Sequence, residues 1–159
     1  MSKIVTTKSI ENALKKIDNL TEDALEKKIE TFQLLQPDLL PYLMQAGFDF
    51  DNEELNAFVV YYFAVTMEAF NVEGIKLNSV TEDEIGEFQE SFLLALDEVS
   101  KEDFLPMHEL LNQPQLISFI LNELEAKDED GESFDDETQN QLFIVLMGMI
   151  GLLNQAIAD

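Results

Sequence analysis

The stretch DEDGESFDDE, residues 128–137, carries the densest group of side chains that could do chemistry in this sequence. Seven of its ten residues are acidic: Asp128, Glu129, Asp130, Glu132, Asp135, Asp136 and Glu137. Carboxylates gathered in this way can coordinate a divalent cation, contact a basic partner, or simply keep a loop hydrated. The spacing of the residues helps to choose among these three interpretations.

A calcium loop of the EF-hand type needs a Gly at its sixth position and a Glu at its twelfth. Counted from Asp128, these positions hold Ser133 and Gln139, and Gln139 has no carboxylate. Counting from Asp130 places Phe134 among the ligands, which is worse. We therefore predict no metal ligand and no cofactor, and interpret the stretch as a solvated loop or as a docking element for a partner. Calcium binding stays as an alternative.

Other catalytic constellations lack their essential residues. There is no Cys, and His108 is the single imidazole, in a context (FLPMHELL) that marks no nucleophile. The six Gly are scattered singly, so no phosphate-binding loop is predicted. Glu68, within the apolar run AVTMEAF, is the one carboxylate whose burial would alter its chemistry, and its simpler interpretation is a charge at the fraying end of a core helix. The sequence predicts no catalytic residue and no enzyme.

The charge balance excludes several classes of partner. All nine basic residues are Lys, and 33 acidic residues give a formal net charge of -24. A protein so acidic, without Arg, is unsuited to neutralising nucleic-acid phosphates or an anionic membrane surface. The N-terminal stretch has neither the apolar core nor the cleavage site of a secretory signal, so a cytoplasmic location is expected.

The charge is also uneven along the chain. Residues 1–28 contain six Lys and five acidic residues, a balance of +1, whereas the remaining residues contain three Lys and 28 acidic residues, a balance of -25. A field of this kind steers a basic protein toward the acidic surface. Solubility alone is the other explanation.

The apolar periodicity is helical nearly throughout, and no strand pattern competes with it. We predict an all-α protein, a compact bundle of about eight helices in a single domain, 1–159, with an irregular connection at about 72–80. The expected helix boundaries are caps at Ser9, Thr21, Asp51, Ser100 and Asp135, a capping box of Thr81 with Glu84, a start at Pro114, and ends at Pro37, Gly47, Leu111 and Ala126.

Two stretches, 58–70 and 142–153, are apolar on every face. Both are shorter than the roughly 20 apolar residues that a membrane span needs, so we predict two central core helices. Tyr61, Tyr62, Phe63 and Met67 are accordingly interpreted as packing residues. A homodimer in which the two long helices meet across an interface is an alternative.

A local pattern recurs along the chain. Phe50-Asp51-x-Glu53-x-x-Asn56 returns as Phe134-Asp135-x-Glu137-x-x-Asn140. Upstream, Gln36-Pro37-x-Leu39-Leu40 resembles Gln113-Pro114-x-Leu116-Ile117. Two matched blocks in the same order predict an internal duplication with halves at 9–71 and 81–158. Together these patterns favour a non-catalytic protein that binds a basic protein partner, in an inhibitor-like or adaptor role, with the residues of the 128–137 stretch as the expected contacts.

Overall fold

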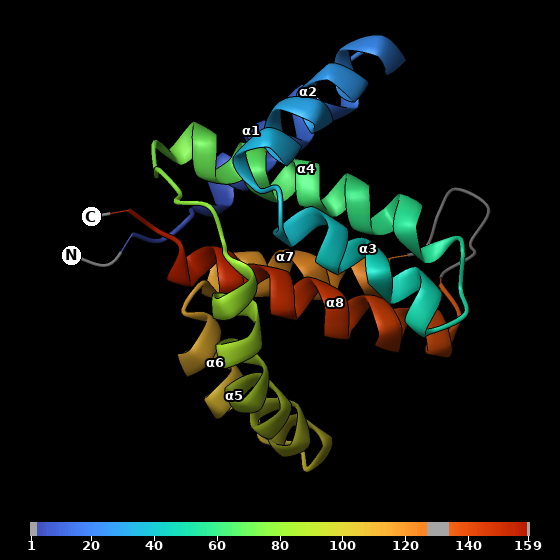
Figure 1. Cartoon of the computed structure of the whole chain (residues 1–159), viewed down its shortest axis with the longest axis vertical. Coiled ribbons are helices and arrows are strands. Elements are labelled where there is room, and N and C mark those ends of the chain that lie inside the picture. Colours follow the sequence, from blue (N-terminus) through green and yellow to red (C-terminus); the bar gives the residue numbers. More distant parts are fainter. Residues whose placement is uncertain (1–2, 127–133, 159) are drawn as a thin grey trace.

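The computed structural model describes residues 3–126 and 134–158. In this part of the chain all regular structure is α-helical, apart from an isolated antiparallel bridge between Leu77 and Ile157. The predicted all-α class and the number of helices are therefore confirmed. The elements, seen in Figure 1, are α1 (Thr7–Asp18), α2 (Glu22–Leu35), α3 (Leu39–Asp49), α4 (Leu55–Glu73), α5 (Glu82–Ser100), α6 (Leu105–Leu111), α7 (Pro114–Glu125) and α8 (Asp136–Gln155).

Two helices, α4 and α8, form the centre of the bundle and pack directly against each other. Each is apolar around most of its circumference, so each must be covered on several sides. Helices α1, α2 and α3 cover α4, and α3, α5, α6 and α7 cover α8. Figure 1 places the α1–α2 pair at one end of the molecule and the α5–α6 pair at the other.

Helix α4 is long and apolar enough to cross a membrane by length and composition alone. Its mean hydropathy reaches 1.2 over the most apolar 18-residue window, and 61% of that window is buried inside the protein. This burial fits the predicted role as a core helix. That the protein has no membrane partner stays a prediction.

The helix starts test the expected caps. Thr21 and Asp135 cap α2 and α8 as predicted, and Thr81 forms the predicted capping box with Glu84 at the start of α5. The prediction for Ser9 was wrong. Thr6 caps α1 instead, three residues earlier, so Ser9 lies in the first turn with its side chain buried.

Helix α1 completes its cap with a carboxylate from another helix. Glu73, at the end of α4, accepts hydrogen bonds from the backbone N–H of Thr6 (3.3 Å), from its hydroxyl (2.8 Å) and from the Ser9 hydroxyl. The Ser9 and Thr6 hydrogen bonds hold the pKa of Glu73 below its usual value. At the start of α5 the same two groups of Thr81 donate to Glu84 (3.1 and 3.0 Å), which belongs to that helix. The N-termini of α1 and α5 are thus each completed by one carboxylate, which comes from α4 in the first case and from α5 itself in the second.

The region between α3 and α4 departs from the prediction. Gly47 does not end α3, which continues to Asp49, and the amide side chain of Asn56 fills the space beside Gly47 where a Cβ would lie. Asp51 does not cap α4: it has a left-handed φ of 53°, and α4 begins at Leu55. Asp51 belongs to the turn that ends α3: its N–H donates to the carbonyl of Phe48 (3.1 Å), and the N–H of Asn52 donates to the carbonyl of Gly47 (2.8 Å).

The connection between α5 and α6 also differs. Ser100 was predicted to cap α6, but it is the last residue of α5, where its hydroxyl donates to the carbonyl of Asp97 (2.6 Å). The chain turns at Glu102, with a φ of 68°, and α6 begins at Leu105. Asp103 accepts from the N–H of Leu105 (3.1 Å) and supplies the polar group expected from Ser100. The predicted start of α7 at Pro114 is confirmed.

Two fully buried glutamines tie distant segments together. Gln36 accepts from the N–H of Val80 (2.8 Å) and donates to the carbonyl of Asn78 (2.9 Å). Gln113 accepts from the N–H of Val5 (2.9 Å) and donates to the carbonyl of Lys3 (2.8 Å). In both cases the side-chain amide bonds to two residues, two positions apart, in the extended segment that precedes a helix.

A glycine of α8, Gly151, allows α5 to approach closely. The rings of Phe88 and Phe92 stack on each other with centroids 5.4 Å apart. A Cβ added to Gly151 would lie 2.5 Å from the Phe88 ring, and one added to Gly148 would lie 3.5 Å from the Phe92 ring. The contact between α5 and α8 therefore depends on the missing side chain at Gly151.

We expect Gly151→Ala to lower the free energy of unfolding by about 2 kcal/mol, because the added methyl must displace the buried Phe88 ring. Gly86→Ala is the matched control: Gly86 is exposed on α5 with no atom near its missing Cβ. That change should raise stability by about 0.5–1 kcal/mol through helix propensity. Urea unfolding followed by circular dichroism measures both. Equal effects of the two substitutions would contradict the close α5–α8 contact.

Candidate protein-binding surface

The acidic residues predicted as contacts divide into two groups. Asp128, Glu129, Asp130 and Glu132 lie outside the residues that the structure describes. Asp135, Asp136 and Glu137 are exposed at the start of α8. Asp135 caps that helix, accepting from the N–H of Thr138 (2.7 Å), and this hydrogen bond lowers the pKa of Asp135. Within residues 3–126 and 134–158, no three acidic or histidine side chains are grouped so that they could hold a metal ion.

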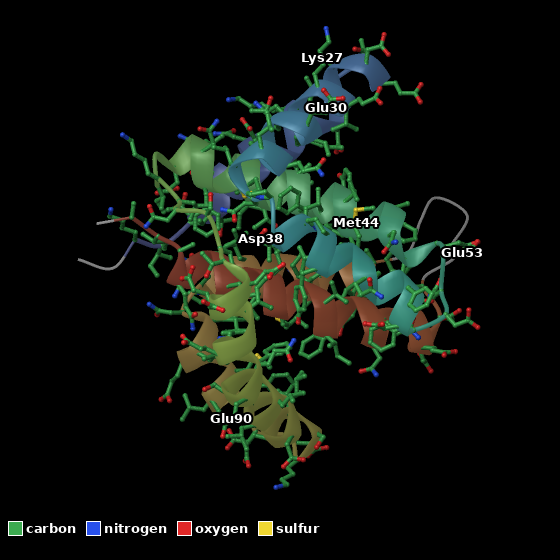
Figure 2. All side chains as sticks on the ribbon, viewed as in Figure 1. Lys27, Glu30, Asp38, Met44, Glu53 and Glu90 are labelled. Atoms are coloured by element: carbon green, nitrogen blue, oxygen red, sulfur yellow. The ribbon has the colours of Figure 1, made fainter. Side chains whose placement is uncertain are left out.

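Among the residues that the structure describes, lysines lie on α1 and α2 or, as with Lys3, Lys76 and Lys101, outside the helices. Five Lys lie on α1 and α2: Lys8, Lys15, Lys16, Lys27 and Lys28. Helices α3 to α8 contain no Lys in their sequences. Figure 2 shows Lys27 near the tip of the α1–α2 end, whereas Glu53 and Glu90 mark acidic positions elsewhere in the molecule. The described surface therefore has a mixed end and an acidic remainder.

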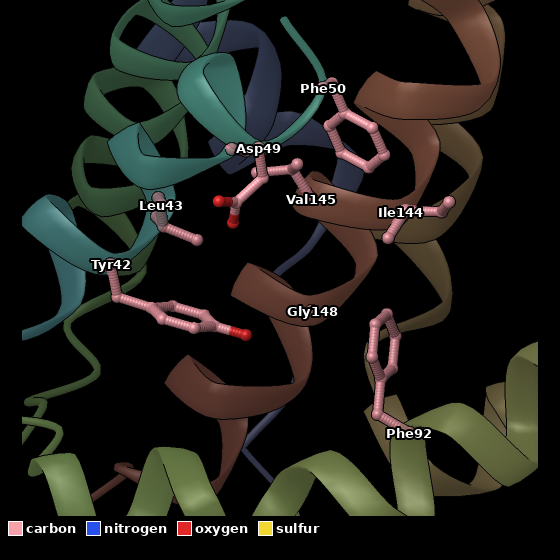
Figure 3. A pocket seen from close by; sticks show the side chains of 9 residues that line it. Tyr42, Leu43, Asp49, Phe50, Phe92, Ile144, Val145 and Gly148 are labelled. Atoms are coloured by element: carbon pink, nitrogen blue, oxygen red, sulfur yellow. The ribbon is translucent and has the colours of Figure 1, made fainter.

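A groove of about 190 Å³ lies between α3, α5 and α8, three helices that contain no Lys. Figure 3 shows its walls, which come from α3, α5 and α8. The lining is mainly apolar and aromatic: Tyr42, Leu43, Ala46, Asp49, Phe50, Phe92, Ile144, Val145 and Gly148. Residues far apart in the sequence meet here because α3 and α5 both pack on α8.

Two polar groups stand in the groove. The Tyr42 hydroxyl accepts a hydrogen bond from Gln89 of α5 (2.8 Å), which links two walls and leaves its own proton free to donate to a ligand. Asp49 is exposed, and its carboxylate is turned into the groove in Figure 3. An apolar hollow with a few polar groups at its edge is typical of a site that binds another molecule.

An exposed apolar stripe runs along α3 beside the groove. Pro41, Met44 and Phe48 line a shallow open hollow together with Gln45. Phe48 is 80% exposed, which is unusual for a Phe. Apolar side chains on neighbouring positions of one helix enlarge the surface on which a partner can bury apolar area.

The groove was not predicted from the sequence. The predicted third helix ended at Gly47 and so did not include Phe48, Asp49 or Phe50. A signal was nevertheless present, because residues 39–50 contain more apolar positions than one buried helix face can take. Such an excess indicates a second, exposed apolar face, although it does not reveal which helices meet it.

Glu68 is a buried carboxylate, as its apolar neighbours suggested, but the interpretation as a fraying helix end was wrong. It is fully buried in α4, five residues before the end of that helix. Its Oε1 lies 3.4 Å from Nζ of Lys16 on α1. Its Oε2 lies 2.9 Å from Nζ of Lys28 on α2, in a direction that makes no hydrogen bond. One carboxylate thus holds two helices against α4 by charge.

The other side chains considered for function are structural. Tyr62, Phe63 and Met67 are buried in the core, so the packing interpretation is confirmed for them. Tyr61 is half-buried, and its hydroxyl donates to Asp18 (2.7 Å); burial, followed by the Asp18 hydrogen bond, raises its pKa. His108 is exposed on α6, as expected for a helix residue near the surface.

Comparisons of this chain with protein-family models, curated proteins and solved structures give no match. Its function is therefore inferred from its own residues.

We expect the loss of stability to be larger when the two lysines are removed than when the carboxylate of Glu68 is removed. Replacing both Lys16 and Lys28 by Met leaves a buried carboxylate without a counter-ion and should lower the free energy of unfolding by about 3 kcal/mol. Glu68→Gln leaves two lysines that still reach water, and should cost about 1–2 kcal/mol. Chemical denaturation measures both variants. The control, Lys27→Met, alters an exposed neighbour and should change stability by less than about 0.5 kcal/mol. A double Lys variant as stable as this control would contradict the buried ion pair.

Proposed function

We propose that this chain is a non-catalytic, acidic helical protein that binds a basic protein partner. The observation that carries the proposal is the separation of charge: α3 to α8 contain no Lys, and the lysines of the described helices lie on α1 and α2. A surface of one sign speeds the approach of an oppositely charged partner and orients it. An inhibitor-like or adaptor role fits a protein that acts by binding a partner through its surface.

The apolar groove favours binding over solubility as the reason for the acidity. Charge that serves solubility alone needs only dispersed exposed carboxylates. Here a hollow lined by Tyr42, Phe50 and Phe92, with Asp49 beside them, lies between three helices that contain no Lys. Aromatic side chains in such a hollow are typical of the central residues of protein interfaces.

The chemistry of the groove supports a non-catalytic role. Its titratable groups are one carboxylate, Asp49, and one phenol, Tyr42. An acid–base pair or an activated nucleophile with its base would need further groups within hydrogen-bonding reach. His108 does not line it. Binding is the activity that these residues support best.

Affinity capture from native cell extract tests the proposal. We expect a basic protein to be retained at low salt and released as salt rises, because the long-range attraction is screened. Glu87→Gln with Glu90→Gln, both exposed on α5, should weaken retention by roughly threefold to tenfold. Glu11→Gln with Glu26→Gln removes the same charge from the α1–α2 end and should weaken it less. If an unrelated protein of matched negative charge retains the same partner equally well, the proposal is wrong.

We further propose that the chain consists of two duplicated units of four helices, α1–α4 and α5–α8. The two glutamine contacts support this: Gln36 of the first unit holds residues 78–80, and Gln113 of the second holds residues 3–5. These segments lead directly into the equivalent caps Thr6 and Thr81. Each unit would then close the start of the other in a reciprocal manner.

Equivalent roles predict equivalent losses for the two glutamines. Gln36→Ala and Gln113→Ala each leave a backbone N–H and a carbonyl without their partner, so each should lower the free energy of unfolding by about 2–3 kcal/mol. Gln33→Ala, at an exposed position of α2, is the control and should change little. Thermal and urea unfolding provide the measurements. A large loss at one glutamine and none at the other would count against two equivalent units.

A further inference from the structure

We infer that the groove between α3, α5 and α8 is the docking site for one basic amphipathic helix of the partner, which inserts a single apolar side chain. This inference rests on the proposed function and specifies where and how the partner binds. It is argued from the size of the groove, its lining and the charge of its walls.

The size fits one side chain. The groove measures about 190 Å³. An apolar cavity of about 150 Å³ is large enough to take a benzene molecule. One Phe or Leu side chain therefore fills the groove, whereas two do not. The buried floor, formed by Leu43 and Val145, gives this anchor apolar surface, and the rings of Phe50 and Phe92 stand beside it in Figure 3.

The neighbouring stripe indicates a helix as the occupant. Positions 41 and 48 of the stripe each come one residue before positions 42 and 49, which face the groove. One residue corresponds to a rotation of about 100° around a helix, so the stripe lies on the face of α3 next to the groove. A helix lying along α3 with its anchor in the groove can cover Met44 and Phe48 with its remaining apolar residues. Anchors at i, i+3, i+4 and i+7 are the pattern by which an amphipathic helix fills such a surface.

Charge selects a basic partner and disfavours a second copy of this chain. The three helices that form the walls carry ten carboxylates and no Lys, and two of the ten, Asp97 and Glu98, pair with Lys101 directly after α5. Asp49 sits at the groove itself, within reach of a Lys or Arg next to the anchor. A second copy would bring a further formal charge of -24 to the same acidic face, and like charges at an interface repel.

Binding of labelled synthetic peptides to the full chain tests the inference. The probe is an 18-residue helix of Lys and Leu with one Phe among its apolar positions. Its two controls are a scrambled peptide of the same composition and an oligolysine of the same charge. We expect the amphipathic peptide to bind at one per chain and about tenfold more tightly than either control, by fluorescence anisotropy.

Variants locate the site. Ala46→Leu fills the groove from its floor and Asp49→Lys reverses its charge, so each should weaken the amphipathic peptide at least tenfold. The matched controls, Leu34→Ala and Asp23→Lys, change an exposed apolar residue and an exposed charge on α2 and should leave binding unchanged. Thermal unfolding of each variant shows whether it is folded.

Three outcomes would overturn the inference. Equal binding of the three peptides, unaffected by the groove variants, would mean recognition by charge alone and would leave the proposed function in place. No binding of the amphipathic peptide would remove the docking site, while capture from extract judges the proposed function separately. A dimer in sedimentation analysis that Ala46→Leu dissociates would assign the groove to a second copy.

Discussion

The contact between α4 and α8 is the constraint on which the rest of the structure depends. Each helix is apolar on almost its whole circumference, so neither is stable in water until it is surrounded. Their mutual contact covers one side of each, and the other six helices cover the remainder. The arrangement of the bundle therefore follows from the need to bury the apolar surfaces of α4 and α8.

The same constraint explains where the surface is incomplete. Helix α8 is covered by α3 on one side and by α5 on another, and Gly148 on α8 leaves room between them. The two covering helices touch through the hydrogen bond from Gln89 to Tyr42, and the groove lies where their side chains leave α8 uncovered. A binding surface arises here from the geometry of covering a core helix, with α3 offering apolar residues on both its buried and its exposed face.

Much of the fold can be predicted from local signals, and the failures have identifiable physical causes. The caps Thr21 and Asp135 and the Thr81–Glu84 pair were predictable because each is settled within one turn of helix. Ser9 was mispredicted because Glu73, from another helix, takes part in the cap of α1. Gly47 and Asp51 were mispredicted because α3 ends in a local turn at Asp51, where the N–H of Asn52 donates to the carbonyl of Gly47 and the N–H of Asp51 to that of Phe48. The groove was missed because it depends on how three helices meet. The acidity of the surface, by contrast, is a property of composition and was evident from the sequence.

The contacts of the extended segments have a consequence for synthesis of the chain. Residues 3–5 leave the ribosome long before their partner Gln113, which follows more than a hundred residues later, and residues 76–78 pair with residues 156–158. Helices α1 to α4 are therefore made before α8, so the side of α4 that packs on α8 stays exposed in the nascent chain. The many negative charges of the protein repel such chains from one another and limit their association.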